Sequence, residues 1–263
     1  MNFIKTFLQN HFTVKQRQQL RIYIANILSI FFRSNLNILG KLYKTDKVDG
    51  HNYMTHYMTH LKKYRYRRVK LLEIGVGGYE VPDGGGHSLR MWKKYFPFGK
   101  IFSIDIYDKS ALEERRIKIF QGSQVDRDFL EKMIDEIGEL DIIIDDGSHE
   151  NEHIIETFKI LFPKLKDGGI YIIEDLQTSY WQHKGGDSGN LNNPQTAMNF
   201  LKSLTDCLNN QEFLIPDYEQ TYYDKKIISI HFYHNLVFIY KDDNLEKSNL
   251  VTNGRFRKQK GNQ

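Results

Sequence analysis

The sequence predicts an α/β fold, namely a Rossmann-like, doubly wound and mostly parallel sheet with an antiparallel C-terminal hairpin, preceded by an N-terminal helical segment. Five short apolar runs between residues 69 and 173 alternate with helix-like stretches, at steps of roughly 20 to 30 residues. Most of these runs end in glycines or carboxylates, and a last pair of apolar runs is separated by a short turn. Such alternation indicates βαβ units, which form a parallel sheet covered by helices on both faces.

The N-terminal segment, residues 1–40, is predicted to be helical because apolar side chains recur there at helical spacing, at Leu20, Ile24, Ile27, Leu28 and Phe31. We expect this segment to pack on the main domain or on a second subunit. Basic residues lie among the apolar ones, so peripheral contact of this helix with a membrane surface is an alternative that the sequence leaves open.

The longest near-apolar stretch is too short to span a bilayer. Ile22–Phe32 has eleven residues, whereas a spanning helix needs ~20. No small-residue cleavage site follows it, so a secretory signal is not expected. The single cysteine, Cys207, excludes an internal disulfide framework and agrees with a reducing compartment. We therefore expect a cytoplasmic globular protein.

The main domain is predicted to cover residues 41–245. Its parallel strands are the apolar runs Val69–Ile74, Lys100–Ile106, Ile117–Phe120, Leu140–Ile144 and Gly169–Ile173. The predicted helices are Ser88–Tyr95, Asp126–Ile137, Glu150–Leu165 and Pro194–Leu208. The C-terminal hairpin pairs Lys226–Phe232 with Asn235–Tyr240. Residues 246–263 are predicted to be a basic, disordered tail.

The composition is that of an ordinary folded domain. Of the 263 residues, 40% are apolar and 27% are charged, which excludes a mainly disordered protein. The net charge of +4 is too small to indicate nucleic-acid binding by itself.

The first strand leads into a glycine-rich turn, Glu73-Ile74-Gly75-Val76-Gly77. A dinucleotide fingerprint requires a third glycine, and that place is held here by Glu80. An acid two residues before the first glycine is instead the form seen in S-adenosylmethionine (SAM) methyltransferases, where glycines let the backbone approach the ligand. Asp105, thirty residues after Gly75, ends the second strand and is placed to accept both ribose hydroxyls, although it could also be a strand-end cap.

The segment His149-Glu150-Asn151-Glu152-His153 matches the zinc-protease motif H-E-x-x-H. That motif needs both histidines on one face of a helix. Here His149 follows a strand end by a few residues, so we expect it in a strand-to-helix turn facing the edge of the sheet. The sequence therefore does not favour a protease.

Three carboxylates follow the fourth and fifth strands: Asp146, Glu174 and Asp175. Acids gathered at one edge of a sheet repel one another unless a cation neutralises them. Oxygen ligands of this kind suit Mg²⁺. The alternative is that these acids cap helices or form ion pairs.

Together these motifs resemble the metal-dependent sugar O-methyltransferases of macrolide deoxysugar biosynthesis and their relatives in polysaccharide clusters. The resemblance runs from Leu42 to about Lys241, some two hundred residues, and its joint spacing is specific. The matching pieces are Lys44-Thr45-Asp46-Lys47 with His51 and Tyr53, and the segments 72–80, 84–97, 104–110, 145–153 and 172–181. The cephalosporin-hydroxylase-like group shares the metal-and-SAM pattern and leaves the exact reaction open.

The resemblance implies a SAM- and Mg²⁺-dependent O-methyltransferase that acts on a sugar hydroxyl of a glycan or a glycosylated metabolite. It implies Asp146, Glu174 and Asp175 as magnesium ligands and His149 as the catalytic base. It further implies that SAM is contacted by Glu73, Gly75, Gly77 and Asp105, and that Asp126 reaches the adenine. We expect a homo-oligomer and a sugar-containing acceptor.

Two other functions remain open at this point. Lys62–Lys70 holds six basic residues in nine, with two interleaved tyrosines, which is suggestive of an RNA methyltransferase but short. We expect this run to be a solvated helix face, and nucleic acid is not an expected partner. The second alternative is a SAM-binding module without catalysis, which acts as an assembly partner through its N-terminal helix.

Overall fold

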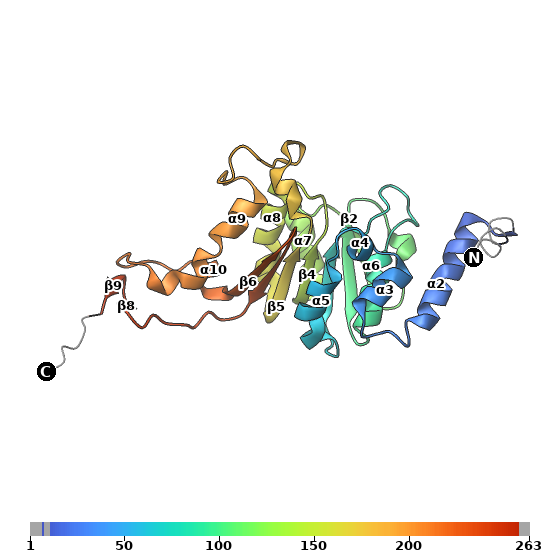
Figure 1. Cartoon of the computed structure of the whole chain (residues 1–263), viewed down its shortest axis with the longest axis horizontal. Helices are drawn as coiled ribbons and strands as arrows, with labels where there is room; N and C mark the ends of the chain where they lie inside the picture. Colours follow the sequence, from blue (N-terminus) through green and yellow to red (C-terminus); the bar gives the residue numbers. More distant parts are fainter. Residues whose placement is uncertain (1–6, 8–10, 258–263) are drawn as a thin grey trace.

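The computed structural model describes Phe7 and residues 11–257 of the chain (Figure 1). Its centre is a seven-stranded sheet in the order β3-β2-β1-β4-β5-β7-β6. The bounds of the strands are β1 Lys70–Ile74, β2 Lys100–Asp105, β3 Ile117–Gln121, β4 Leu140–Asp145, β5 Leu165–Ile173, β6 Ile227–Tyr233 and β7 Leu236–Lys241. The first five strands are parallel, and β7 runs antiparallel to both β5 and β6. The predicted doubly wound sheet with its antiparallel hairpin is confirmed.

Helices cover both faces of the sheet because successive strand residues alternate between two apolar cores. Leu71 packs into one core, with residues of α3, α5 and α6, and Leu72 into the other, with residues of α7, α8 and α9. The helices are α2 Val14–Leu28, α3 Leu36–Tyr43, α4 Asp46–Asp49, α5 Met54–Leu61, α6 His87–Tyr95, α7 Arg127–Ile137, α8 Asn151–Leu161, α9 Ala197–Ser203 and α10 Tyr222–Lys226. None of the helices in the described part of the chain is long and apolar enough to cross a membrane.

Several predicted boundaries were wrong for identifiable reasons. The fifth strand starts at Leu165 rather than Gly169, because the polar residues that follow Leu165 are taken into the strand at a register shift. The predicted helix over residues 194–208 is shorter, because the side chain of Thr196 accepts a hydrogen bond from the amide of Asn199 and so caps α9.

The two ends of the chain also differ in detail from the sequence prediction. The N-terminal segment holds α2 and continues into α3, with a turn between them. In the predicted tail, β8 (Val251–Thr252) and β9 (Arg255–Phe256) form a small antiparallel pair, so this part is ordered. Residues 258–263 lie outside the described residues.

His60 on α5 links the helix layer to the edge hairpin. Its Nδ1 lies 2.8 Å from the Tyr240 hydroxyl, its Nε2 lies 2.9 Å from the Tyr233 hydroxyl, and its ring stacks on Phe238. Burial is the main cause that lowers the pKa of His60 to about 4, from an ordinary value near 6.5. The neutral ring therefore fits this site, and the charged ring does not.

The lowered pKa of His60 predicts acid-sensitive stability. As the pH falls, the His60 ring is protonated in the unfolded chain before it is protonated in the folded protein. The contribution of neutral His60 to the free energy of unfolding is therefore complete above about pH 6.5 and is lost as the pH falls towards 4. We expect the free energy of unfolding to fall less steeply over this range in His60→Gln than in the wild-type protein. Urea unfolding at a series of pH values measures this slope. His234→Gln, an exposed position in the same hairpin, should behave like wild type; equal slopes in all three proteins would contradict the assignment.

Candidate active site

Four parallel strands end level with one another and bring the predicted site residues to one edge of the sheet. In the strand register, Ile74 pairs with both Ile104 and Asp145, and Asp145 pairs with Ile173. The residues that follow these positions therefore leave the sheet side by side. This edge is where open parallel sheets bind their ligands.

The glycine turn after β1 packs directly on the loop after β4. Gly75 has φ +93°, and a Cβ on it would lie 2.2 Å from the carbonyl oxygen of Asp146. Gly77 has φ +76°, and a Cβ there would meet no heavy atom of the described residues within 4 Å. Gly75 is thus required by a close approach of two backbones, whereas Gly77 leaves open space beside the turn.

The two glycines predict different costs of substitution. Gly75→Ala adds a backbone clash to the strain of its positive φ, so we expect it to destabilise the fold by about 1–3 kcal/mol more than Gly77→Ala, which adds strain alone. We also expect Gly75→Ala to displace Asp146. Thermal unfolding of the two variants measures the difference, and equal melting temperatures would contradict the packing described here.

Asp105 organises the neighbouring turn. Its Oδ2 accepts a hydrogen bond from the amide of Val76 and its Oδ1 accepts one from the amide of Tyr107, each at 3.0 Å. Each carboxylate oxygen keeps a further lone pair for a ligand. Asp126 lies elsewhere, at the start of α7, where its Oδ1 accepts from the amide of Phe129 at 3.1 Å and caps the helix.

Glu73 lies beneath the glycine turn rather than on its surface. Its side chain is fully buried. Its Oε2 accepts a hydrogen bond from the Ser88 hydroxyl on α6 at 2.8 Å, and its Oε1 lies 3.3 Å from the ammonium of Lys47. In this structure Glu73 therefore supports the turn from inside the protein.

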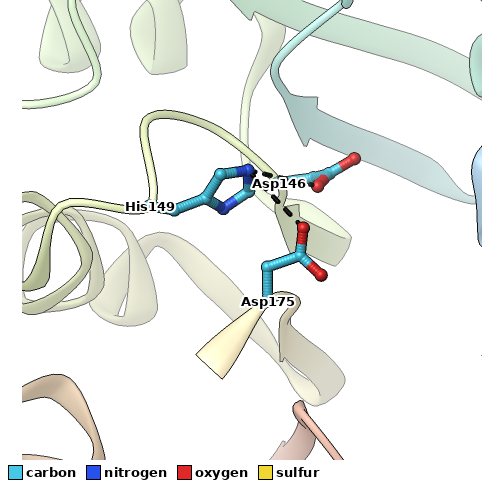
Figure 2. A group of neighbouring side chains, drawn as sticks. All are labelled: Asp146, His149 and Asp175. Atoms are coloured by element: carbon cyan, nitrogen blue, oxygen red, sulfur yellow. Dashed lines mark ion pairs between the residues drawn. The ribbon is translucent and has the colours of Figure 1, made fainter. Parts of the chain in front are cut away.

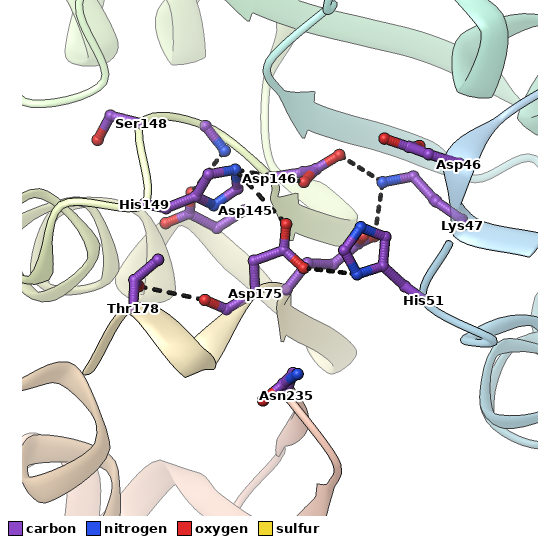
Figure 3. Close-up of polar contacts among 12 residues, drawn as sticks. Asp46, Lys47, His51, Asp145, Asp146, Ser148, His149, Asp175, Thr178 and Asn235 are labelled. Carbon is purple, nitrogen blue, oxygen red and sulfur yellow. Dashed lines mark hydrogen bonds and ion pairs between the residues drawn. The ribbon is translucent and has the colours of Figure 1, made fainter. Parts of the chain in front are cut away.

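Lys47 on α4 is the centre of a buried charge cluster. Its ammonium donates to Asp146 Oδ2 at 2.5 Å (Figure 3) and to Glu174 Oε1 at 2.7 Å, in addition to the contact with Glu73. The hydroxyl of Tyr57 also donates to Glu174 Oε1. The lysine side chain is 1% exposed, so these carboxylates provide its charge compensation in place of water.

The charges of this cluster depend on one another. Burial alone would lower the pKa of Lys47, but the surrounding carboxylates raise it well above its usual range. Burial, together with the charge of Asp146, raises the pKa of Glu174. The ammonium is thus held in its charged form by the acids it contacts.

A second group, Asp146, His149 and Asp175 (Figure 2), shares Asp146 with this cluster, and its three side chains are half-buried. His149 Nε2 is 3.9 Å from Asp146 Oδ1 and 3.7 Å from Asp175 Oδ2. His149 and Asp175 both have positive φ, of 57° and 55°. Non-glycine residues in this conformation are uncommon and concentrate at functional sites.

Two residues of the segment before α5 fix Asp175. The hydroxyl of Tyr53 donates to Asp175 Oδ1 at 2.8 Å, and His51 Nδ1 lies 3.3 Å from the same oxygen. Asp175 Oδ2 is the oxygen that faces His149. Each carboxylate of the group therefore has one oxygen held by the protein and one directed towards His149.

The predicted magnesium ligands are divided between the two groups. Asp146 belongs to both, Asp175 lies with His149, and Glu174 lies with Glu73 around Lys47. Within each group the ligand atoms are within 4.8 Å of one another. Carboxylate oxygens are the donors that Mg²⁺ prefers, so Asp146 and Asp175 fit such an ion; Glu174 Oε1 already accepts from the Lys47 ammonium, and its second oxygen is the one that could serve a metal.

The H-E-x-x-H segment does not have the geometry of a zinc protease. His149 precedes α8, which starts at Asn151, so the two histidines do not share a helix face. His153 lies within α8, where its Nδ1 is 2.8 Å from the Ser148 hydroxyl.

Sequence reasoning assigned no role to four residues that contact the acids: Lys47, His51, Tyr53 and Tyr57. Three of them stand in the segment that carried the family resemblance, and that was the available signal. The contacts of Lys47 join residues 99 and 127 positions apart in the chain, which the pattern of the sequence does not reveal.

Comparisons with known proteins agree with the fold and the resemblance. No protein-family model matches the chain. It is 43% identical over 216 residues to the mycinamicin VI 2''-O-methyltransferase of Micromonospora griseorubida. The matched region covers 81% of this chain and 54% of that protein. The chain is 45% identical over 217 residues to the demethylmacrocin O-methyltransferase of Streptomyces fradiae, with 81% and 55% covered.

A solved structure shows the same relationship in three dimensions. The MycE methyltransferase of the mycinamycin pathway, in complex with Mg, SAH and mycinamycin VI, matches with a TM-score of 0.78 and 43% identity over 81% of this chain and 55% of that chain. The chain spans about half the length of the curated relatives it matches. The methyltransferase fold and the resemblance to sugar O-methyltransferases are confirmed.

Proposed function

Because this chain is homologous to the O-methyltransferases that act on macrolide and deoxysugar compounds, we propose that it transfers a methyl group from SAM to a hydroxyl of a sugar, in a reaction that requires Mg²⁺. The observation that carries the proposal is the meeting of His149 with Asp146 and Asp175 at the edge of the sheet, beside the glycine turn. The acceptor is proposed to be a glycan or a glycosylated metabolite.

SAM is proposed to lie along the turn after β1. The open side of Gly77 gives room for the ligand, and Asp105 offers carboxylate lone pairs at the adjacent strand end, where ribose hydroxyls would be accepted. Gly75 keeps this turn close to the loop of Asp146, so the reacting centre and the cofactor would be neighbours. Glu73 would act from beneath the turn, and Asp126 from the start of α7.

Asp146, Glu174 and Asp175 are proposed to hold the magnesium ion. A bound divalent cation polarises a hydroxyl and lowers its pKa, which makes a sugar alcohol a better nucleophile. One oxygen of each acid is held by a hydrogen bond: Asp146 Oδ2 by Lys47, Asp175 Oδ1 by Tyr53 and Glu174 Oε1 by Tyr57. These bonds orient the second oxygen of each acid.

His149 is proposed to be the general base. Its Nε2 lies 3.9 Å from Asp146 Oδ1 and 3.7 Å from Asp175 Oδ2, so the ring is directed at the proposed metal site, where it would accept the proton of the hydroxyl. The positive φ of His149 turns its side chain towards this group instead of along α8. The chain's other contribution is positioning, since methyl transfer needs the acceptor oxygen in line with the methyl carbon.

The RNA methyltransferase alternative is not favoured. The basic run Lys62–Lys70 ends where β1 begins, at the opposite end of that strand from the glycine turn. Several of its cations also lie over aromatic rings: Lys63 over Tyr240, and Arg65 over Tyr66. These contacts within the protein account for the basic run without a bound nucleic acid.

The proposed reaction is tested with methyl-labelled SAM and a panel of glycosides and nucleotide sugars. We expect label in a sugar, loss of transfer after EDTA treatment, and recovery when Mg²⁺ is restored. Transfer that resists EDTA, or transfer to RNA but to no sugar, would contradict the proposal. The homo-oligomer expected from the sequence remains a prediction, which light scattering of the purified chain would measure.

A further inference from the structure

Helix α2 exposes several large apolar side chains. A surface helix ordinarily buries its apolar stripe and exposes its polar one. In α2 and the residue after it, the buried positions are the small side chains Ala25 and Ser29. Tyr23, Ile24 and Ile27 are exposed instead. Leu20 and Ile22 are half-buried, so α2 carries apolar side chains on its inner side and on its outer side, where a polar stripe is usual.

The orientation of α2 is fixed by specific contacts with the main domain. The hydroxyl of Tyr43 on α3 donates to Asn26 Oδ1 at 2.9 Å and to Ser29 Oγ at 3.3 Å. Lys94 on α6 donates to the carbonyl of Asn26 at 3.4 Å. These bonds hold the side of α2 that carries Asn26 and Ser29 against the body, so Tyr23 and Ile27 lie on its outer side.

The turn that follows α2 continues the exposed apolar surface. In this turn Ile30 is 53% exposed and Phe31 77%, and Tyr23 of α2 is 64% exposed. The whole surface, here termed the α2 face, consists of Tyr23, Ile24, Ile27, Leu28, Ile30, Phe31 and Phe32. In Figure 1, α2 lies at one end of the molecule, beside α3 and away from the sheet. Large apolar side chains exposed together on one helix and the turn after it indicate a binding face.

The charge of the surrounding segment has one sign. Residues 1–45 contain no Asp or Glu and seven basic residues: Lys5, Lys15, Arg17, Arg21, Arg33, Lys41 and Lys44. Arg17, Arg21 and Lys44 line a cavity of about 680 Å³ between α2 and the body, together with Arg90 of α6 and with apolar side chains of α2, among them Ile24 at the edge of the α2 face. Arg90 is paired with Glu114 at 3.7 Å, whereas the cations of residues 1–45 have no acid within their own segment.

We propose that the α2 face binds an anionic lipid bilayer. Exposed aliphatic and aromatic side chains enter the headgroup region, and the basic residues of the same segment pair with lipid phosphates. A second copy of this chain fits less well, because two such segments would bring like charges together. Nucleic acid would satisfy the cations but would leave the aliphatic side chains in water. The proposal is independent of methyl transfer, since none of these residues belongs to the candidate active site.

The test is flotation of the full chain with lipid vesicles. One set contains phosphatidylcholine alone, and the other contains equal parts of phosphatidylcholine and phosphatidylglycerol. We expect binding to the anionic vesicles, weakened by salt, and little binding to the neutral ones. The double variant Ile27→Glu with Phe31→Glu should abolish binding. Replacement of Arg17 and Arg21 by glutamine should weaken it roughly fivefold per residue.

Matched controls distinguish this face from general stickiness. Leu245 and Leu250 are exposed to a similar degree near the other end of the chain, so replacing both with glutamate should leave vesicle binding unchanged. Equal loss in this control, or absence of wild-type binding to anionic vesicles, would overturn the proposal. The proposal would also be overturned if the wild-type protein forms an oligomer that does not bind vesicles and that the Ile27 and Phe31 substitutions dissociate. The α2 face would then bind a second copy of the chain.

Discussion

Replacing His149 with alanine is expected to lower the rate of methyl transfer by about 10²- to 10⁴-fold, the usual contribution of a positioned general base. The affinities for SAM and for Mg²⁺ should change little, because His149 lies 3.7 Å or more from the two carboxylates and at the surface of the group. Single-turnover rates with labelled SAM, together with calorimetric titrations, separate these two effects.

His153→Ala is the matched control for this prediction. His153 is the second histidine of the same segment, but it lies on α8 and contacts Ser148. We expect its substitution to leave most of the rate intact. A His149→Ala protein that retains its rate, or that loses SAM binding in proportion to its rate, would show that His149 is not the base.

Replacing Lys47 with methionine is expected to weaken Mg²⁺ binding by about 10- to 100-fold, the range for residues that orient metal ligands. The ammonium holds one oxygen of Asp146 and one of Glu174, so without it both acids lose their fixed orientation. Three clustered acids would also lose their buried counter-charge, which costs about 3–5 kcal/mol of folding free energy. Metal titration and urea unfolding measure the two effects.

Lys241→Met provides the comparison for Lys47→Met. Lys241 is also buried, but its ammonium donates to the backbone carbonyls of Pro163 and Leu165. We expect it to lose stability without losing metal affinity. If Lys47→Met alone does not fold, adding Glu73→Gln removes one uncompensated charge and should restore folding without restoring metal affinity. Metal binding at wild-type strength in either folded Lys47 variant would contradict the assigned role.

The sheet could be predicted from the sequence because its signals are local. Runs such as Leu140–Ile144 are apolar over the length of a buried strand, and polar residues follow them directly. Since parallel strands end at one edge, the positions of Asp146, Glu174 and Asp175 near one another followed from the strand assignment. The predicted convergence of Gly75, Asp146 and His149 had the same origin.

The division of the acids into two groups could not be predicted from the sequence. Glu174 and Asp175 are adjacent in the chain, but the left-handed conformation of Asp175 turns its side chain towards His149 while Glu174 points inward to Lys47. Lys47 itself stands in a short polar stretch that reads as exposed. Similarly, the apolar spacing in residues 20–31 predicted a helix but did not indicate which of its faces meets the protein.

The most direct test of the central claim, a SAM and Mg²⁺ site at the edge of this sheet, is calorimetric titration of EDTA-stripped protein with each ligand, for wild type and for Asp146→Asn. We expect wild type to bind SAM and to give a magnesium heat that is absent in Asp146→Asn, with SAM binding largely retained in the variant. Failure of SAM to bind wild type, with or without metal, would contradict the account, and the acids at the strand ends would then need another explanation.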